Sequence, residues 1–373
     1  LWQLYAAIVA AAYTRALLES MPSQESNEHE DIAVYNQHNG GRERSFVDEI
    51  FAKMTWHHPL ILLAQADMEQ EKVIDAILDR ARESFGANNT FRFSLPCSSK
   101  ADLETYFAYV GKRCGFPHSV TGPVQLQDAF TDLISAGKRL FLLVDEFENG
   151  PEESCRELAG ILRNLSEKHH DYFNIVMAGG EKLANLKYHP SLEHSLLNNA
   201  EVMEWPELKI EDVLEIHRLP NNGASETQTS TSNGTGINDN RTCINNKIDL
   251  NEAKADFFLK MSGGHPRLLR YYLQFYNQQP ALKENDYYQK LLQYDFLRQI
   301  FHPFLKDRNN ADRIRKLLEK EEVWQYYFPY VEDPLIRKLY WKNLIVKKIA
   351  IGGMVHWVWR CEAIREAGRR VLR

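Results

Sequence analysis

The sequence contains 373 residues, of which 44% are hydrophobic and 26% are charged. This is an ordinary globular composition, and the length suits two or three domains. The net charge of −6 excludes a uniformly basic nucleic-acid-binding surface but allows a local basic patch. No two cysteines form a CxxC pair, so we expect free thiols in a reducing cytoplasm, and neither a zinc site nor a disulfide framework, at Cys97, Cys114, Cys155, Cys243 and Cys361.

The N-terminal segment is apolar and rich in alanine. Arg15 interrupts it before the ~18 apolar residues of a membrane span accumulate, and no basic region precedes it as in a signal peptide. We therefore expect a soluble helix and a polar linker within residues 1–39, and no membrane association.

Strand-like and helix-like segments alternate from Phe46 onward. Apolar runs at residues 59–64, 139–146, 173–180 and 200–205 have the length of buried strands, and residues 90–95 alternate as a strand does. Helical periodicity separates them, at residues 46–54, 69–85, 101–112, 124–136 and 152–168. The pattern predicts an α/β domain over residues 40–219, with a parallel sheet and helices on both faces.

The remainder divides into three segments. Residues 220–248 hold few large apolar side chains, so we predict a disordered insertion. Residues 249–330 are predicted to be helical. In residues 331–373 a helix (334–341) precedes two strands (343–350 and 354–359) that meet at Gly352-Gly353, and a last helix follows (361–372). A helix followed by a hairpin is typical of the end of a winged helix.

Two acidic residues end the apolar run at 139–146. In a P-loop NTPase an Asp at such a strand end holds Mg²⁺, usually through water, and the following Glu polarises the attacking water. Asp145 and Glu146 are therefore candidate catalytic residues, and Asp145 is the candidate Mg²⁺ ligand. The alternative is that both acids only cap the next helix.

Three further motifs occur in a characteristic order. GGRER at residues 40–44 resembles the GRE box that opens many AAA+/STAND domains, and NIVMAGG at 174–180 falls where a sensor-1 strand is expected. SGGHPRLL at 262–269 resembles the GGxPxxL motif that opens the sensor-2 helix of the lid. Together they resemble the AAA+/STAND class of P-loop NTPases, including prokaryotic ATPases and initiator-like proteins, over residues 40–373. The resemblance implies a P-loop NTPase sheet, a helical lid and a C-terminal winged helix.

The sequence departs from this class at the phosphate-binding loop. The first strand should run into GxxxxGK[ST], but Gln65 and Gln70 occupy the glycine positions and Glu71 the lysine position, with Lys72 one step away. Glutamine does not permit the positive φ and close backbone approach that phosphate binding uses. Carboxylates in the loop would each repel a triphosphate by on the order of 1–4 kcal/mol, against about 8 kcal/mol for micromolar affinity.

The degenerate nucleotide site implied by the resemblance has few cations. Arg267 is placed as a sensor-2 arginine, with a surface charge on the lid helix as the alternative. Asn198 and Asn199 stand where an arginine finger is often found. The candidate cofactor-binding residues for ATP and Mg²⁺, should the site be active, are Arg42, Glu43, Gln70, Glu71, Lys72 and Arg267.

The C-terminal tail is basic. Residues 335–373 contain ten Lys or Arg against two Glu. Lys347, Lys348, Arg369 and Arg370 are candidates for contact with nucleic acid or a protein partner.

Three functional hypotheses follow. The first is a regulatory or scaffold protein, deficient in nucleotide binding, that docks a partner or an upstream domain. The second is an active ATP-dependent switch with an atypical loop. The third is an initiator-like protein that binds nucleic acid through a winged helix.

Overall fold

The computed structural model describes residues 42–54, 58–94, 102–116, 120–188, 197, 199–218, 249–326, 328, 329, 331, 333–349 and 353–373. The predicted N-terminal helix and linker (1–39) and the predicted insertion (220–248) lie outside these residues.

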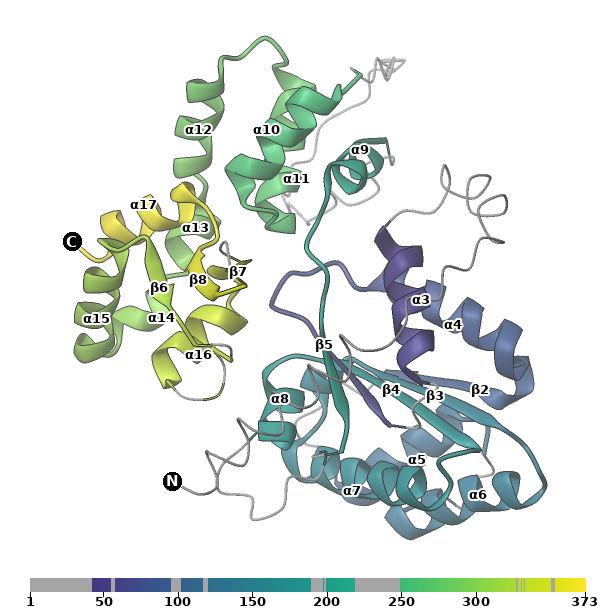
Figure 1. The fold of residues 1–373 in the computed structure, drawn as a ribbon. Coiled ribbons are helices and arrows are strands. Elements are labelled where there is room, and N and C mark those ends of the chain that lie inside the picture. Colours follow the sequence, from purple (N-terminus) through teal and green to yellow (C-terminus); the bar gives the residue numbers. More distant parts are fainter. Residues whose placement is uncertain are drawn as a thin grey trace, which may run out of the picture. The chain divides into compact units, whose positions relative to one another are not determined.

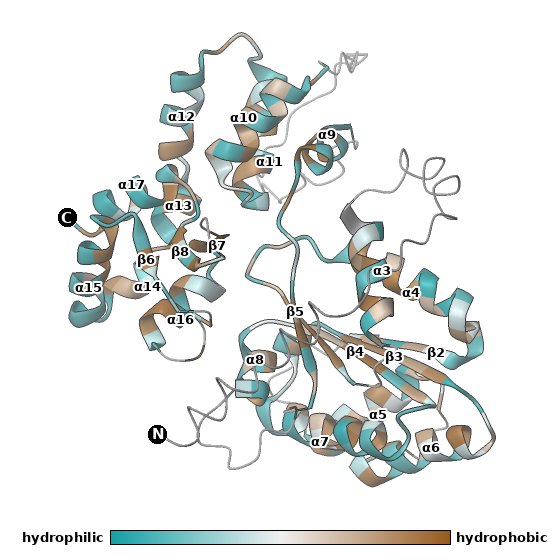
Figure 2. Ribbon diagram, viewed as in Figure 1, coloured by the Kyte–Doolittle hydropathy of each residue, from teal (hydrophilic) through white to brown (hydrophobic). Residues whose placement is uncertain are grey.

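A five-stranded parallel sheet forms the centre of the α/β domain (Figure 1). Its order is β2-β3-β4-β1-β5. The bounds are β1 (Leu60–Leu63), β2 (Thr90–Ser94), β3 (Leu140–Asp145), β4 (Phe173–Gly179) and β5 (Glu201–Glu204). Every residue of β1 and β3 is buried, as expected for strands covered on both faces, and Figure 2 shows the sheet coloured mainly as hydrophobic.

Helices cover both faces of the sheet (Figure 1). The apolar sides of α3 (Arg42–Met54) and α4 (Glu71–Phe85) pack with Leu60 and Leu62 on one face. On the opposite face, Ile61 and Leu63 belong to the core that includes side chains of α5 (Leu103–Arg113), α6 (Pro123–Ser135) and α7 (Glu152–Lys168). The predicted α/β class with helices on both faces is confirmed.

The segment after the sheet is mainly helical. Helix α8 (Glu181–Tyr188) lies between β4 and β5, and α9 (Ile210–Arg218) follows β5. The following helices are α10 (Glu252–Ser262), α11 (Pro266–Gln278), α12 (Glu284–Leu292), α13 (Asp295–Gln299), α14 (His302–Leu305) and α15 (Arg308–Leu318). Segment 249–330 also contains one strand that the sequence did not indicate, β6 (Glu322–Trp324).

The C-terminal segment follows the predicted order of elements. It contains α16 (Pro334–Trp341), β7 (Ile345–Ile349), β8 (Val355–Trp359) and α17 (Glu362–Val371). Strands β7 and β8 pair in antiparallel fashion, as predicted for a hairpin, and β6 joins the other side of β8. The three-stranded sheet therefore includes residues on both sides of position 331, and the domain boundary there stays a prediction.

None of the helices in the described part of the chain combines the length and the apolar character needed to cross a bilayer.

Candidate functional site

The loops at the carboxyl ends of β1, β3 and β4 meet at one edge of the sheet, where parallel α/β sheets commonly bind ligands. After β1 the chain turns through Asp67, which has a left-handed φ of 61° that non-glycine residues rarely adopt. Helix α4 then begins at Glu71, and Gln70 at its N-cap makes no side-chain capping bond. Gly180 follows β4, and an added Cβ there would lie 3.1 Å from the Ala64 carbonyl oxygen, so glycine suits this close approach.

Asp145, at the end of β3, forms an ion pair within the protein. Its Oδ2 accepts hydrogen bonds from Nη2 and Nε of Arg92 at 2.7 and 3.0 Å. Arg92 lies on the neighbouring strand β2 and also reaches Asp75 at 3.2 Å. A guanidinium cation thus already neutralises Asp145, the residue that in a P-loop NTPase would serve Mg²⁺.

Glu146 has left-handed backbone geometry, with φ 52° and ψ 36°. Its exposed carboxylate accepts a hydrogen bond from Asn149 at 3.2 Å. The next acid, Glu148, binds the backbone amides of Gly180 and Lys182 at the start of α8, at 2.8 and 3.0 Å. Glu148 therefore caps α8, because its carboxylate accepts hydrogen bonds from the first amides of this helix.

Gln65 connects the loop after β1 with the C-terminal segment. Its Nε2 donates to the carbonyl oxygens of Tyr340 and Ile345, at 2.8 and 3.0 Å. Its Oε1 accepts from Nη2 of Arg360 at 2.6 Å. Gln65 is 7% exposed, so these bonds give its buried carbonyl oxygen a donor and use both amide protons.

Backbone contacts extend this connection, which we call the clasp (Gln65, Ala66, Asn343 and Arg360). The Ala66 amide donates to the Trp341 carbonyl at 3.0 Å. The Ala66 carbonyl accepts from Nδ2 of Asn343 at 2.8 Å, and Asn343 has a left-handed φ of 60°. The backbone amide and carbonyl of Ala66, in the loop that would face phosphates in a P-loop NTPase, therefore bond to the C-terminal segment.

Arg360 links the clasp to Glu207 and to the turn between α10 and α11. The guanidinium forms two hydrogen bonds with Glu207, at 2.6 and 2.9 Å, and donates to the Gly263 carbonyl at 3.0 Å. At Gly263 an added Cβ would lie 1.9 Å from the Arg360 carbonyl oxygen, and φ is +61°. Glycine is thus required at this position of the SGGHPRLL motif by the close contact with the end of β8.

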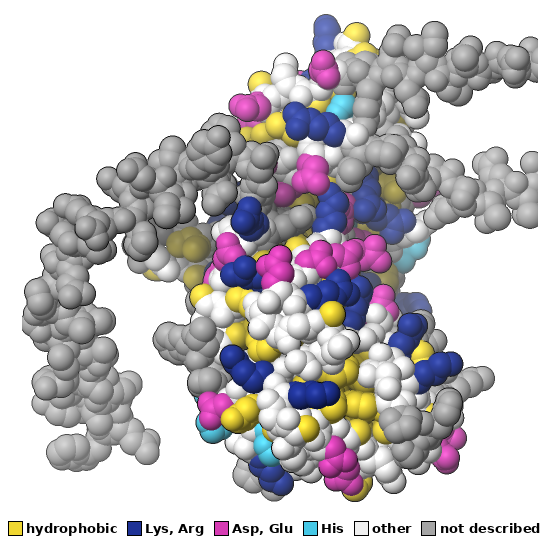
Figure 3. All heavy atoms as spheres, turned by 90° about the vertical axis from the view of Figure 1, so that its right-hand side faces the viewer, with side chains coloured by type: hydrophobic (Ala, Val, Ile, Leu, Met, Phe, Trp, Pro, Cys, Tyr) yellow, Lys and Arg dark blue, Asp and Glu magenta, His cyan; other side chains and the backbone are white. Residues whose placement is uncertain are grey.

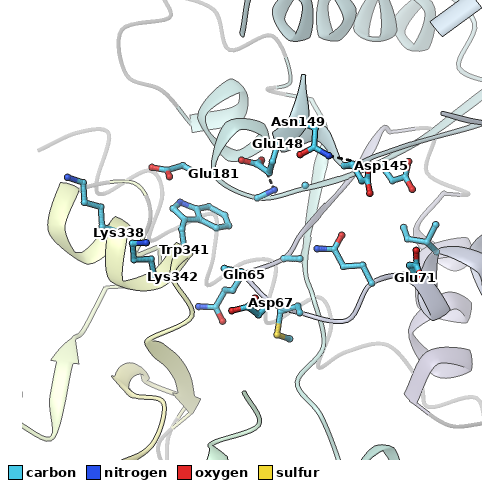
Figure 4. Close-up of a pocket in the computed structure, with 18 of the residues that line it drawn as sticks. Gln65, Asp67, Glu71, Asp145, Glu148, Asn149, Glu181, Lys338, Trp341 and Lys342 are labelled. Atoms are coloured by element: carbon cyan, nitrogen blue, oxygen red, sulfur yellow. Dashed lines mark hydrogen bonds between the residues drawn. The ribbon is translucent and has the colours of Figure 1, made fainter. Parts of the chain in front are cut away.

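The loops line an open cavity of about 600 Å³ (Figure 4). Lys338 of α16 and Lys342, which caps the end of this helix, line it together with Trp341. The acidic lining residues are Asp67, Glu71, Asp145, Glu146, Glu148 and Glu181, and the basic lining residues are Arg92, Lys338 and Lys342. Burial and the nearby Glu148 raise the pKa of Glu181, while Arg337, Lys338 and Lys342 act in the opposite direction.

The cavity includes four of the residues proposed from the sequence, namely Gln70, Glu71, Asp145 and Glu146. Two others are not among its lining residues. Lys72 forms an ion pair with Glu215 of α9 at 2.7 Å. The exposed Arg267 lies over the ring of Phe296, 4.3 Å from its centroid.

The side chains of Arg42 and Glu43 and the predicted finger position Asn198 lie outside the described residues, although the backbone of Arg42 and Glu43 begins α3. The positions of this box relative to the cavity therefore stay a prediction.

The four basic tail residues do not form one surface cluster. Lys347 reaches Glu204 at 3.3 Å, and its neighbour Lys348 is exposed on the same strand. Arg369 and Arg370 form ion pairs with Glu362 and Glu366 of their own helix, at 2.9 and 3.0 Å. On the face shown in Figure 3, acidic and basic side chains are interspersed over the described residues.

The residues present fit ATP and Mg²⁺ poorly. A lysine that could neutralise phosphates from the loop is bonded elsewhere, and the strand-end Asp145 already has a cation. The amides at the start of α8 are taken by Glu148.

Sequence reasoning missed several residues of this site, above all Arg92, Glu148, Arg360, Lys338 and Lys342. Arg92 offered one signal, a charged side chain in the middle of a strand-like segment. The remaining contacts depend on segments far apart in the chain and had no local signal.

No model of a known protein family matches the chain, and no curated protein matches it in sequence. Among solved structures it is similar to the ORC2 protein of Aeropyrum pernix in ADPNP and ADP complexes, with 11% identity over 92% of this chain and 98% of that chain and a TM-score of 0.46. It is also similar to Cdc6p from Pyrobaculum aerophilum (9% identity, 92% and 99% covered, TM-score 0.40). A third similar structure is a variant of RuvB from Thermotoga maritima (12%, 85% and 91%, TM-score 0.34). At TM-scores below 0.5 these likenesses say nothing of what this chain binds.

Proposed function

We propose that this chain is a regulatory or scaffold module on an AAA+/STAND-like α/β fold, that it works without nucleotide, and that it docks a protein partner. The clasp is the observation that supports this most directly. In a P-loop NTPase the loop after the first strand binds phosphates through its backbone. Here Gln65 and Ala66 of that loop bond to the C-terminal segment.

The charge of the cavity supports the same proposal. Six carboxylates and three cations line it, and one of the cations, Arg92, is paired with Asp145. A triphosphate would meet repulsion of on the order of 1 kcal/mol or more from each nearby unpaired carboxylate. Contributions of this size from several carboxylates remove a substantial part of the ~8 kcal/mol that micromolar affinity represents.

Calorimetry with ATP and Mg²⁺ tests nucleotide independence. We expect no binding tighter than roughly millimolar, and no rise of the melting temperature at saturating nucleotide. The Lys72→Ala variant should behave as the parent does, because Lys72 bonds to Glu215. The rival ATP-switch hypothesis would be supported by a low-micromolar Kd that Lys72→Ala abolishes, or by ATP turnover that Glu146→Gln removes.

Nucleic-acid binding through the tail is the second rival. Of the four candidate tail cations, Lys347 contacts Glu204, and Arg369 and Arg370 are paired within α17, so three already have carboxylate partners. We expect only non-specific duplex affinity, weaker than about 1 μM at ~150 mM salt, with a steep salt dependence. Sub-micromolar binding that is lost in Lys347→Glu/Lys348→Glu/Arg369→Glu/Arg370→Glu would favour the nucleic-acid hypothesis instead.

A further inference from the structure

A second cavity lies in the C-terminal part of the chain. It is an open groove of about 620 Å³ between α15 and the segment that contains β6, two elements that lie side by side in Figure 1. Helix α15 contributes Arg313, Lys316 and Lys320 to this α15–β6 groove. Glu322 is the one acidic residue among the described side chains that line it, so the formal charge of the lining is positive.

Two of these cations are available to a ligand. Arg313 is paired with Asp333 at 2.6 Å. Lys316 and Lys320 are exposed, and among the described residues neither has a carboxylate within 4.0 Å. The two lysines are four positions apart on one side of a helix, which separates them by about 6 Å along its axis. Alternate residues of an extended peptide share one side at a spacing of about 6.8 Å, so two acidic residues in such a peptide can each meet a lysine.

The unpaired edge of β6 is a second, independent observation. Strand β6 ends the order β6-β8-β7 and pairs with β8 only. The outer backbone groups of an edge strand have no strand partner, and an extended peptide can pair with them as an added strand. The five residues from Glu322 to Tyr326 all line the α15–β6 groove, so this backbone borders it. A peptide in the groove therefore finds backbone partners on one side and lysines on the other.

The remaining lining also suits a peptide. Tyr326 is 59% exposed, and its ring centroid lies 5.0 Å from that of Trp324, which gives the groove an aromatic wall. Exposed aromatic side chains are enriched where proteins bind one another. A nucleic-acid backbone fits less well, because it has no N–H group for the carbonyl oxygens of a strand and because the carboxylate of Glu322 repels phosphates.

We propose that the α15–β6 groove binds an acidic segment of a protein partner, which adds as a strand beside β6 and places alternate acidic side chains on Lys316 and Lys320. The proposal rests on the proposed function, since it names the chemistry of the docked partner.

Fluorescence anisotropy with the labelled peptide GSETETETEGS tests the proposal on the full chain at ~100 mM salt. In the first comparison peptide, GSQTQTQTQGS, glutamine replaces every glutamate, and we expect at least about tenfold weaker binding because the charge is lost. The second, GSEPEPEPEGS, keeps the four glutamates but has proline between them. We expect it to bind severalfold more weakly, because proline has no N–H to donate to a neighbouring strand.

Variants locate the site. Lys316→Glu/Lys320→Glu should weaken binding of the glutamate peptide at least about tenfold, whereas Glu322→Gln should tighten it about two- to threefold. The matched control is Lys112→Glu/Lys138→Glu, which makes the same charge change at two exposed lysines of the α/β domain. It should change the affinity less than about twofold, because long-range attraction between exposed charges is screened. Since Glu322→Gln is expected to gain affinity, loss of folding cannot imitate the expected result.

Equal binding of the glutamate and glutamine peptides, equal weakening by the control pair, or weakening by Glu322→Gln would overturn the recognition of acidic residues. Equal binding of the proline peptide would overturn strand addition. An oligothymidine that binds more tightly than the glutamate peptide, and whose binding Lys316→Glu/Lys320→Glu abolishes, would assign the groove to nucleic acid instead.

A parallel titration with ATP and Mg²⁺ separates this proposal from the proposed function. Low-micromolar nucleotide binding would contradict the proposed function whatever the peptides do. Absence of both peptide and nucleotide binding would contradict only the assignment of the α15–β6 groove.

Discussion

The ion pair between Arg92 and Asp145 decides what the acid at the end of β3 does. The side chain of Asp145 is 5% exposed and that of Arg92 33% exposed, so the pair sits at the boundary between core and cavity. Removing one partner of such a pair leaves an uncompensated buried charge, which costs more than the intact pair contributes. A structural role for Asp145 therefore makes a different prediction from a catalytic one.

Arg92→Met should lower the free energy of unfolding by about 2–3 kcal/mol, because Asp145 then stays buried without a cation. The double variant Arg92→Met/Asp145→Leu should recover much of this free energy of unfolding, since no unpaired charge is then left at the edge of the core. Urea unfolding measures both, with Arg80→Ala as the control, because the exposed pair of Arg80 with Glu83 should be worth less than about 1 kcal/mol. A double variant that is as unstable as the sum of its single variants would contradict the coupling.

His265 makes the stability depend on pH. It is fully buried at the start of α11, and its Nδ1 accepts a hydrogen bond from the Arg267 amide at 3.3 Å. Burial, with Arg360 and Arg267 nearby, lowers the pKa of His265 from 6.5 to about 3. The unfolded chain therefore takes up this proton at a higher pH than the folded protein does, so the stabilising effect of the neutral imidazole is complete above about pH 6.5 and decreases as the pH falls toward 3.

His265→Asn should flatten this dependence while keeping a side chain that can cap the helix. We expect the slope of the unfolding free energy between pH 6 and 4 to decrease by roughly 1 kcal/mol per pH unit. Denaturant unfolding at several pH values measures the slope. An unchanged slope would assign the acid sensitivity of the protein to other groups.

At the scale of elements, the clasp joins the loop after β1 to the turn between α16 and β7 and to the end of β8. Its buried hydrogen bonds fix the C-terminal segment on the sheet edge through Gln65, Asn343 and Arg360. Because each bond has a buried partner, loss of one member leaves donors or acceptors without replacement.

Gln65→Ala should destabilise the protein by about 2–4 kcal/mol and increase hydrogen exchange in residues 334–349, because Arg360 and two carbonyl oxygens lose their partner. Gln70→Ala is the matched control: it lies in the same loop, and its side chain makes no capping bond. Hydrogen exchange by mass spectrometry checks both variants. Equal exchange in the two would mean that other contacts hold α16 and β7.

At the scale of the whole molecule, charge is divided between an acidic body and a basic tail. Residues 335–373 carry ten Lys or Arg against two Glu, whereas the complete chain has a net charge of −6. The basic residues of the tail have different partners. Lys347 reaches Glu204 of β5, whereas the arginines of α17 are paired mainly within their own helix. Attraction between tail and body should therefore depend on a few positions.

Lys347→Glu should lower the melting temperature by several degrees at low salt, because it places a carboxylate beside Glu204, and by less at high salt, where the repulsion is screened. Lys348→Glu makes the same charge change at the next, exposed residue of β7 and should have little effect. Differential scanning calorimetry at ~20 mM and ~500 mM salt compares them. Equal shifts in the two variants would mean that net charge, and not this contact, controls the stability.

The sequence by itself determined the α/β class, the buried strands and the elements of the C-terminal hairpin, because strand and helix periodicities are local properties of a chain. It also placed Asp145 and Glu146 at a strand end. Gln65, Gln70 and Glu71 stand where the GxxxxGK[ST] pattern of a phosphate-binding loop would have glycines and a lysine.

Only the tertiary structure decided what surrounds these residues. Arg92 and Asp145 are 53 positions apart, and Gln65 and Arg360 are 295 apart, so no window of sequence contains either pair. The direction of Lys72, toward Glu215 and not into the cavity, likewise depends on where α9 lies. Long-range pairing is set by the order of strands and the packing of domains, and local patterns carry no information about it.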